Sequence, residues 1–204
     1  MDLELWSERL RLVPLSWGDL DLALEMFTDP EVVRYVGDLM DEDAIRAGMP
    51  DSIRRGGDGW IGIWCVSNKD TGEKLGSAFL LPMPVEDDDI DYSLVVPGKV
   101  PGGDIEIGYC FKRSAWGRGY ATEACVRLVR FGFEQTPLTE IVASFHEEHE
   151  ATKNVLRKAG FADRGTMRCY GEDAASYRIT RREWIELTQR AERPAAPARR
   201  SEPR

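Results

Sequence analysis

The sequence predicts an α+β fold, with a central mixed, mostly antiparallel sheet flanked by helices. Two strand-like segments joined by a turn signal stand early in the chain, over residues 60–68 and 74–81. Strand-like and helix-like segments then alternate over residues 105–159, as they do in strand–helix–strand units. Two further strand-like segments follow before a last helix. Hairpins early in the chain and alternating units late in it therefore indicate one mixed sheet.

The first third of the chain reads as one strand followed by helices. Residues 8–15 alternate leucine with arginine up to a proline, which predicts a half-buried strand. Ser16 and Asp19 resemble a capping box, and apolar residues at helical spacing follow them. An Asp-Pro pair opens a second, short helix over residues 29–37. Residues 41–57 suggest a third, broken helical piece.

The remaining elements follow from turn residues and periodicity. Residues 82–104 are rich in proline, glycine and acid, which predicts a loop or insertion with room for one short strand. We expect one domain over residues 1–190 and a disordered tail over 191–204, because that tail lacks apolar anchors. The other expected elements are strands over 105–111 and 140–146, helices over 120–135 and 151–159, a closing strand pair over 161–170 and 175–184, and a last helix from about residue 181.

Composition restricts the class of protein. The chain has 27 Lys and Arg against 36 Asp and Glu, a net charge of -9, which argues against nonspecific nucleic-acid binding and mildly favours cationic partners. No apolar run approaches the roughly 18 residues of a membrane span, so we expect no membrane association. Four widely separated cysteines without a C-x-x-C pair suit a reducing compartment. We therefore expect a soluble, cytoplasmic protein.

Two glycines bracket an arginine where a strand pattern gives way to a helical one. A helix N-terminus exposes unpaired N–H groups, and Gly117 and Gly119 would let a phosphate approach that backbone. Arg118 and the basic pair at 112–113 add positive charge. The alternative is a strand-to-helix turn that needs glycine only for its positive φ. Thr122 stands where a third glycine belongs, which disfavours a dinucleotide-binding fold, and no P-loop pattern is present.

A second element favours the phosphate interpretation. Residues 149–161 read HEATKNVLRKAGF, and with this segment the chain resembles the GNAT acetyltransferase superfamily. Within that superfamily it is similar to the branch of ribosomal-protein N-terminal acetyltransferases and related small-amine acetyltransferases. Three segments match in the family's order: ERLRLVPL, EIGYCFKRSAWGRGYATEA and VLRKAGF. The closing YRITRREW is also similar to this branch, so the resemblance covers most of the chain from Arg9 to Trp184.

The resemblance implies where acetyl-CoA, the cosubstrate, binds. The family's acyl-CoA loop, Q/R-x-x-G-x-G/A, falls on residues 116–121, with a tryptophan in place of the usual Gln or Arg. The amides of this loop would hold the pyrophosphate, and the pantetheine arm would lie between the strands at 105–111 and 140–146, bonded to a strand edge. The implied contacts are Tyr109, Cys110 and Phe111 on that edge, and Trp116, Gly117, Arg118, Gly119, Tyr120 and Ala121 in the loop.

The resemblance also implies transfer of an acetyl group to an amine, a reaction that needs proton donors and acceptors. Many members carry a tyrosine proton donor where this chain has Leu156, which cannot donate a proton. Thr152 is similar to a hydroxyl that this branch places near the CoA sulfur, and it is the substitute candidate. Its alternative role is an ordinary helix-capping hydroxyl. His149, where the family often has Asn, is a candidate proton relay.

Glu106 is the candidate base. A primary amine with a pKa of about 10 must lose a proton before it can attack a thioester. Glu106 lies between Ile105 and Ile107 on a predicted strand, so its side chain points away from the face of those isoleucines. If that face lines the cleft, the carboxylate can accept the proton. If it faces solvent, Glu106 is an ordinary surface charge.

Three further patterns have competing interpretations. Residues 146–150, HEEHE, contain metal-ligand types but lack the H-E-x-x-H spacing, so we expect no metal. The acidic run at 86–91 is a solvated loop or a collar for cationic substrates. Tyr170 and Tyr177, on the closing strands, line the acceptor pocket or serve packing.

The sequence thus predicts a GNAT-type N-acetyltransferase that moves an acetyl group from acetyl-CoA to a primary amine by direct attack in a ternary complex. The acceptor is a protein or peptide N-terminus, or a small cationic amine such as a polyamine or aminoglycoside. The alternative is a non-catalytic acyl-CoA-binding sensor or scaffold. A homodimer is the expected form if the chain oligomerises.

Overall fold

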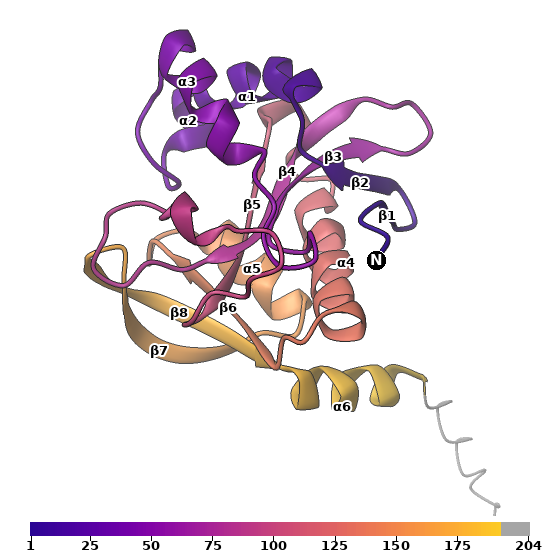
Figure 1. The fold of residues 1–204 in the computed structure, drawn as a ribbon. Coiled ribbons are helices and arrows are strands. Elements are labelled where there is room, and N and C mark those ends of the chain that lie inside the picture. Colours follow the sequence, from indigo (N-terminus) through magenta and orange to yellow (C-terminus); the bar gives the residue numbers. More distant parts are fainter. Residues whose placement is uncertain (193–204) are drawn as a thin grey trace, which may run out of the picture.

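An eight-stranded sheet organises the computed structural model, which describes residues 1–192 (Figure 1). The strand order across the sheet is β1-β2-β3-β4-β5-β6-β8-β7, and every pairing is antiparallel except that of β5 with β6. The strands are β1 (Leu5–Trp6), β2 (Leu10–Pro14), β3 (Gly62–Asn68), β4 (Lys74–Pro82), β5 (Ile105–Phe111), β6 (Glu140–Phe145), β7 (Ala162–Cys169) and β8 (Glu172–Thr180). The predicted mixed, mostly antiparallel sheet is therefore confirmed.

The helices flank this sheet. They are α1 (Leu20–Phe27), α2 (Pro30–Val33), α3 (Glu42–Ser52), α4 (Tyr120–Gln135), α5 (Glu150–Lys158) and α6 (Arg181–Glu192), with 3-10 turns η1 (Trp17–Asp19), η2 (Tyr92–Leu94) and η3 (Arg113–Ala115). The predicted capping box is present, because the Asp19 carboxylate accepts hydrogen bonds from the backbone N–H and the hydroxyl of Ser16, at 3.0 and 2.9 Å. Asp29 caps α2 as predicted, through the N–H of Glu31.

Four details differ from the predictions. The two-residue edge strand β1 was not expected, because two residues carry no readable periodicity. The predicted broken piece at 41–57 contains one continuous helix, α3, with Pro50 in its last turn. The segment 82–104 holds the turn η2 and no named strand. Helix α6 extends to Glu192, and the rest of the tail predicted over 191–204 lies outside the described residues.

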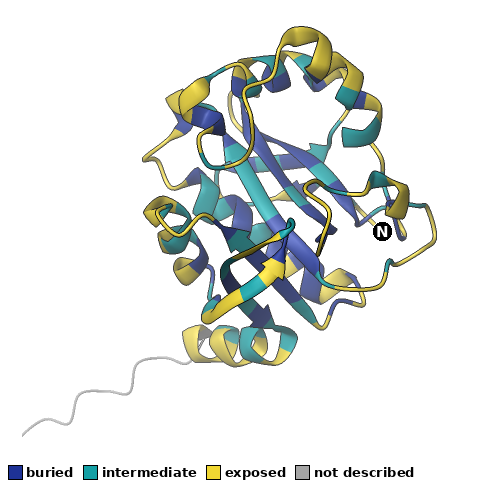
Figure 2. Ribbon diagram, turned by 90° about the vertical axis from the view of Figure 1, so that its left-hand side faces the viewer, coloured by how far each residue is buried: buried dark blue, intermediate teal, exposed yellow. Residues whose placement is uncertain are grey.

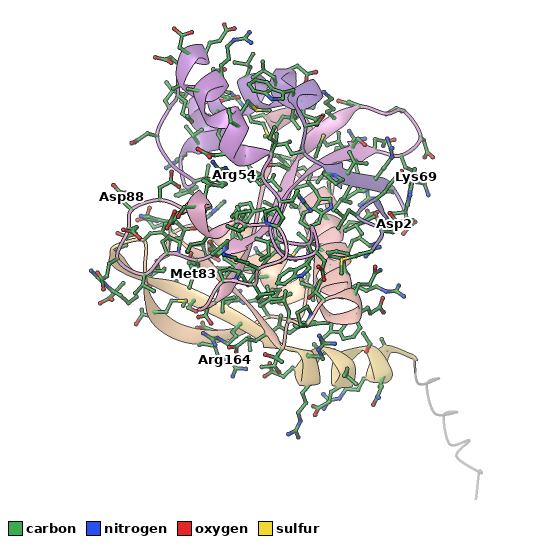
Figure 3. The ribbon with its side chains drawn as sticks, viewed as in Figure 1. Asp2, Arg54, Lys69, Met83, Asp88 and Arg164 are labelled. Carbon is green, nitrogen blue, oxygen red and sulfur yellow. The ribbon has the colours of Figure 1, made fainter. Side chains whose placement is uncertain are left out.

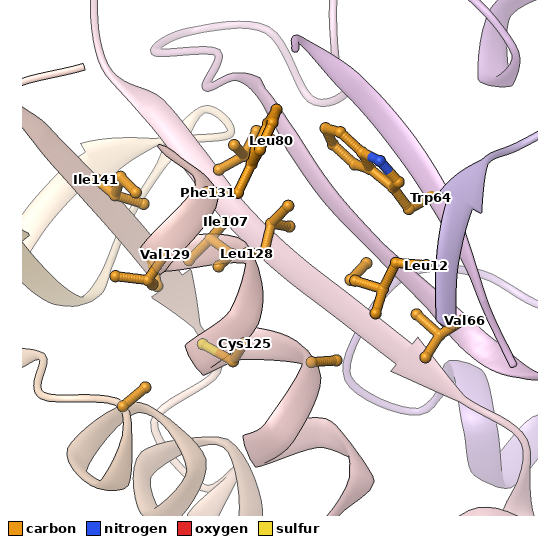
Figure 4. Packing of buried hydrophobic residues seen from close by; sticks show 14 of the residues in the cluster. Leu12, Trp64, Val66, Leu80, Ile107, Cys125, Leu128, Val129, Phe131 and Ile141 are labelled. Carbon is orange, nitrogen blue, oxygen red and sulfur yellow. The ribbon is translucent and has the colours of Figure 1, made fainter. Parts of the chain in front are cut away.

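Alternation along the strands separates two packed faces. On one face, Trp64 of β3 meets Phe131 of α4 edge-on, with ring centroids 5.7 Å apart, in the main apolar cluster (Figure 4). On the other face, Cys65 packs with Leu22 and Met26 of α1. Most strands are largely buried, whereas β7 and the outer sides of the helices are largely exposed (Figure 2). Helix α4 therefore covers one face of the sheet and α1 the other.

The sheet opens between its two parallel strands. β5 and β6 pair at a single position, Glu106 with Val142, whereas β4 and β5 pair over seven positions. Beyond Glu106 the strands part, so one edge of β5 lacks a strand partner over residues 107–111. The glycine-containing segment 112–119 and the N-terminus of α4 follow directly from this open end.

Candidate active site

A cavity of about 1400 Å³ occupies the α1 side of the sheet, where β5 and β6 part. Its walls come from the N-terminal helices, strands β4 to β6, the segment 88–93, the start of α5 and the β7–β8 hairpin. It brings together six residues singled out in the sequence: Glu106, Tyr109, Cys110, His149, Thr152 and Tyr170. The loop 116–121, Phe111 and Tyr177 are outside its lining.

Glu106 lies on the floor of this cavity, only 5% exposed. Ile105 and Ile107 pack into the α4-side core, so the carboxylate points to the opposite face, the first of the two orientations considered. Its Oε1 accepts hydrogen bonds from the N–H and hydroxyl of Ser144, at 3.0 and 2.6 Å, and its Oε2 accepts one from the Tyr170 hydroxyl at 2.6 Å. Burial raises the pKa of Glu106, although these hydrogen bonds act to lower it.

Ser144 and Phe79 are cavity residues that the sequence reasoning missed. Ser144 is two positions beyond Val142, which pairs with Glu106, so both serine and glutamate face the cavity. The signal was a lone polar residue in an apolar strand. The Phe79 ring lies across Gly108 of the neighbouring strand, where an added Cβ would stand 2.0 Å from the ring. Glycine at 108 is therefore required by this aromatic wall.

The loop before α4 has the geometry of an anion cradle. Gly117 and Gly119 have φ values of 70° and 79°, which glycine adopts readily. Within the described part of the chain, the N–H groups of Gly117, Arg118 and Gly119 have no hydrogen-bond acceptor. A Cβ added at Gly117 would meet no atom within 4 Å, so the backbone there is open to a ligand. The residues present therefore fit a pyrophosphate, as the resemblance implied.

Trp116 ties this loop to the end of β5. Its indole N–H donates a hydrogen bond to the carbonyl of Phe111 at 2.7 Å. The residue as a whole is 48% exposed. The hydrogen bond takes up one lone pair of the Phe111 carbonyl. Tyr109 and Cys110 remain on the open stretch of β5 and line the cavity.

The positive charge at the loop differs from the expectation. Lys112 pairs with Glu25 and Glu73, and Arg113 lies 3.6 Å from Asp29, so the charges of both basic residues are offset within the protein. Arg118 lies over the ring of Tyr120 at 5.0 Å. Arg118 therefore remains as the basic loop residue without an ion pair among the described residues.

A second arginine, Arg9 in the turn before β2, contacts the backbone of this loop. The Glu123 carboxylate in the first turn of α4 accepts from the Arg9 N–H and Nε and from the Ser7 hydroxyl, at 2.7, 2.7 and 2.8 Å. Arg9 Nη1 in turn donates to the Arg118 carbonyl at 3.0 Å. Tyr120 is 4% exposed between the two guanidinium groups, so only its backbone is available to a cofactor.

The start of α5 brings Thr152 and His149 together. The Thr152 hydroxyl lies 3.0 Å from His149 Nδ1, and its backbone carbonyl accepts from the Tyr109 hydroxyl at 3.5 Å. His149 stacks on Tyr35, with ring centroids 4.5 Å apart. Burial, followed by the nearby charge of His146, lowers the pKa of His149. This histidine is therefore favoured in its neutral form, which can accept and pass on a proton.

Leu156 and the cysteines offer no acid or nucleophile. Leu156 lines the cavity from the main core with 0% exposure, but its hydrocarbon side chain cannot donate a proton. Burial raises the pKa values of Cys65, Cys110 and Cys125 to about 12, which keeps the thiols neutral near pH 7. A thiol with such a pKa is a poor nucleophile, which favours direct transfer over a covalent cysteine route.

The two tyrosines proposed for the acceptor pocket differ in position. Tyr170 lines the cavity, and its hydroxyl is engaged by Glu106. Tyr177 is 2% exposed and packs edge-on against Phe145, with ring centroids 5.1 Å apart. Tyr177 is thus a core residue. It pairs with Ala143 of β6, and its side chain lies on the α5 side of the sheet. The packing interpretation of Tyr177 fits this position, and the pocket interpretation does not.

The cavity lining is strongly acidic. It carries seven carboxylates and two guanidinium groups: Asp38, Asp51, Asp88, Asp89, Asp91, Glu106 and Glu172 against Arg34 and Arg54. Arg54 is itself paired with Asp51 at 2.8 Å. Figure 3 labels Asp88 on the segment between β4 and β5, and Arg54 near the end of α3. A cationic molecule in this cavity would therefore meet a favourable field.

No group of three or more His, Cys, Asp or Glu is arranged to hold a metal ion within residues 1–192. No helix in the same range is long and apolar enough to cross a membrane.

A sheet that parts between two parallel strands lies beside a glycine loop at a helix N-terminus, the arrangement that the sequence resemblance predicts for acyl-CoA binding. The chain belongs to the GNAT acetyltransferase family, because the family model described as Acetyltransferase (GNAT) domain matches residues 9–162, more than half of its length. It is an N-acetyltransferase of this family, as predicted.

The chain is similar in sequence and in structure to known N-acetyltransferases. In sequence, the chain is 28% identical over 170 residues to the uncharacterized N-acetyltransferase p20 of Bacillus licheniformis, covering 81% of this chain and 86% of that protein. In structure, it is similar to a GNAT family acetyltransferase from Bacillus anthracis, with a TM-score of 0.69, 20% identity, and coverage of 88% of this chain and 99% of that one. RimL, a ribosomal L7/L12 α-N-protein acetyltransferase solved with coenzyme A, has a TM-score of 0.64 at 13% identity, covering 85% of this chain and 95% of its own. At 13% identity the likeness to RimL concerns the fold, and in sequence the chain is 28% identical over 85 residues to the putative ribosomal N-acetyltransferase YdaF of Bacillus subtilis, covering 39% of this chain and 46% of that protein.

Proposed function

We propose that this chain acetylates a primary amine on a small cationic acceptor, by direct attack on acetyl-CoA in a ternary complex, with Glu106 as the base. The observation that carries the proposal is a buried carboxylate, without a cationic partner among the described residues, at the floor of an acidic cavity where the sheet opens. Acetyl-CoA supplies the thioester carbonyl that the amine attacks. Tyr109, Cys110 and the loop 116–121 are the proposed contacts for it.

The protein's own groups have separate roles in this proposal. The acidic lining draws in the protonated acceptor, and Glu106 then removes a proton from the amine, directly or through water. Hydrogen bonds from Ser144 and Tyr170 favour the ionised carboxylate that this step needs, while burial opposes it. Thr152, with His149 behind it at 3.0 Å, is the proposed route for returning a proton to the departing thiolate.

The acceptor class is tested by measuring thiol release from acetyl-CoA over a panel of a polyamine, an aminoglycoside, an amino-acid amide and a peptide, with products identified by mass. We expect the polycationic amines to be the better substrates, with KM rising as ionic strength increases. Preference for the peptide N-terminus would contradict the proposed acceptor class. Tight CoA binding without thiol release for any amine would favour the sensor alternative, which the buried Leu156 at the usual tyrosine position suggests.

The base is tested with Glu106→Gln. Turnover at pH 7 should fall, and raising the pH should partly restore it, because the free-amine fraction then increases without help from a base. Because burial raises the pKa of Glu106, ionisation of this carboxyl destabilises the folded state at a pH above that pKa. The neutral side chain of Glu106→Gln avoids this cost, so the variant should keep or raise Tm. Glu140→Gln on β6, which pairs with Arg178 at 2.7 Å outside the cavity lining, is the matched control. An unchanged pH–rate profile in Glu106→Gln would remove this residue from the mechanism.

A further inference from the structure

Tyr170 occupies a backbone conformation that tyrosine rarely adopts. A two-residue turn joins β7 to β8, and Tyr170 and Gly171 have φ values of 50° and 71°. Turns with two positive φ values match the twist of a hairpin, and their first position favours Asn, Asp or Gly. Tyr170 is the only non-glycine residue with positive φ in the described part of the chain. A large aromatic residue at this position costs stability, so another contact must account for it.

That contact is the hydrogen bond to Glu106. The Tyr170 hydroxyl donates to Oε2 at 2.6 Å, across 64 positions of sequence, whereas Ser144 donates only to Oε1. Without the phenol, Oε2 would have no protein donor among the described residues. The two oxygens of the carboxylate are therefore held by separate elements, Oε1 by Ser144 of β6 and Oε2 by Tyr170 of the β7–β8 turn.

The turn is held in place by the segment that follows β4. The N–H of Tyr170 donates to the Pro84 carbonyl at 3.2 Å, and the N–H of Gly171 donates to the Val85 carbonyl at 3.0 Å. These two backbone bonds join the turn to the segment after β4. The phenol is therefore not a mobile surface group, and it is half-buried in the cavity wall.

The titratable neighbours of this pair are one thiol and one carboxylate. Cys169 precedes the turn and feels the charge of Glu106, and Asp89 on the segment after β4 acts on the Tyr170 hydroxyl. Burial, together with the charges of Glu106 and Asp89, raises the pKa of Tyr170 far above neutral. The phenol therefore remains a hydrogen-bond donor throughout the working range of pH.

We propose that Tyr170 is a positioning residue for Glu106: its strained turn delivers a phenol that orients the carboxylate and favours the ionised form which receives the amine proton. The inference rests on the proposed function of Glu106 as base. Tyr170 also lines the cavity, so this role is compatible with the prediction that it lines the acceptor pocket.

The test compares Tyr170→Phe, Tyr170→Asn and Thr166→Val. Tyr170→Phe keeps the ring and removes one donor to a carboxylate, so the acid limb of the kcat/KM profile should move up by about one pH unit or more. KM for acetyl-CoA should change less than twofold. Tyr170→Asn introduces a residue suited to positive φ, so this variant should have a Tm equal to or above that of Tyr170→Phe. The acid limb of its kcat/KM profile should also move to higher pH, because the phenol is absent. Thr166→Val removes a hydroxyl from the same hairpin, outside the cavity lining, and should leave the profile unchanged.

A second readout does not depend on turnover. Carbon-detected NMR titration of the Glu106 carboxyl should give a higher pKa in Tyr170→Phe than in the wild type. An unshifted pKa and an unshifted acid limb in both Tyr170 variants would overturn the inference. If Glu106→Gln retains the wild-type profile, the proposed base fails; if it loses the acid limb while the Tyr170 variants keep theirs, only the positioning role fails.

Discussion

Gly117→Ala should separate what the glycine loop does for folding from what it does for coenzyme A. At a φ of 70° an alanine costs about 1–2 kcal/mol, and roughly 0.4–1 kcal/mol is regained because alanine restricts the unfolded chain. The new Cβ meets no protein atom within 4 Å, so no steric cost is added. The free energy of unfolding should fall by about 1 kcal/mol, a decrease in Tm of about 2–4 °C for a chain of this length.

Gly72→Ala is the matched control for this change. Gly72 has a φ of 73°, its added Cβ also meets nothing within 4 Å, and it lies in the turn between β3 and β4. Both variants should therefore lose the same stability. CoA binding should suffer only in Gly117→Ala, because its Cβ enters the space in front of the free amides. Losing one hydrogen bond to a charged group, about 1.5–3 kcal/mol, raises Kd about ten- to hundredfold.

Thermal melts measure the first quantity and isothermal titration with CoA the second. If the two variants lose equal stability and both bind CoA like the wild type, Gly117 serves only the turn, and the cradle interpretation is wrong. If Gly117→Ala loses several kcal/mol of stability, the reasoning from open space around the Cβ is wrong.

Three further predictions concern the supports of the site and the fold. Glu123→Gln should raise KM for acetyl-CoA several-fold with little change in kcat, because Arg9 loses the carboxylate that aims it at the loop; equal KM values in steady-state kinetics would contradict this. Arg181→Lys should lower the free energy of unfolding by about 1.5–3 kcal/mol in urea titrations, because one ammonium cannot replace a guanidinium bonded to three carbonyls at the end of α4 and just after it. Burial and the charge of His146 lower the pKa of His149, so stability should hold above a pH of about 6.5 and decline as the pH falls below it. His149→Gln should reduce that decline between pH 7.5 and 5, and an identical decline would show that other groups cause it.

Features that depend on neighbouring residues were predictable from the sequence. The Ser16–Asp19 capping box appears in the structure as predicted, and Gly117 and Gly119 have the positive φ that was one of the two explanations considered for these glycines. Each is decided within about four residues, where side-chain geometry and glycine's freedom act directly. The same locality explains why the alternating units from β5 to α5 were located nearly to the residue.

The convergence at the candidate base was not predictable in the same way. The alternation of side chains along β5 predicted the face on which Glu106 lies. Its hydrogen-bond partners are set by the register of β5 against β6 and by a turn in which tyrosine adopts an unfavourable positive φ. Ser144 was hidden because a single serine in an apolar strand has many explanations. The contact of Tyr170 with Glu106 was hidden because the φ of Tyr170 contradicts what its residue type favours. Long-range register and strain are decided by the whole sheet, which no single segment encodes.

The single pairing of Glu106 with Val142 divides the sheet into two blocks, β1 to β5 and β6 to β8, joined edge to edge at one residue. Glu106 belongs to the first block, and its three hydrogen-bond donors belong to the second, two from Ser144 and one from Tyr170. The hydrogen bonds of the candidate base therefore also connect the two blocks at the position where β5 and β6 begin to separate. Any breathing of one block against the other would release the carboxylate from its donors, so the proton acceptor is fully assembled only while the two blocks are closed.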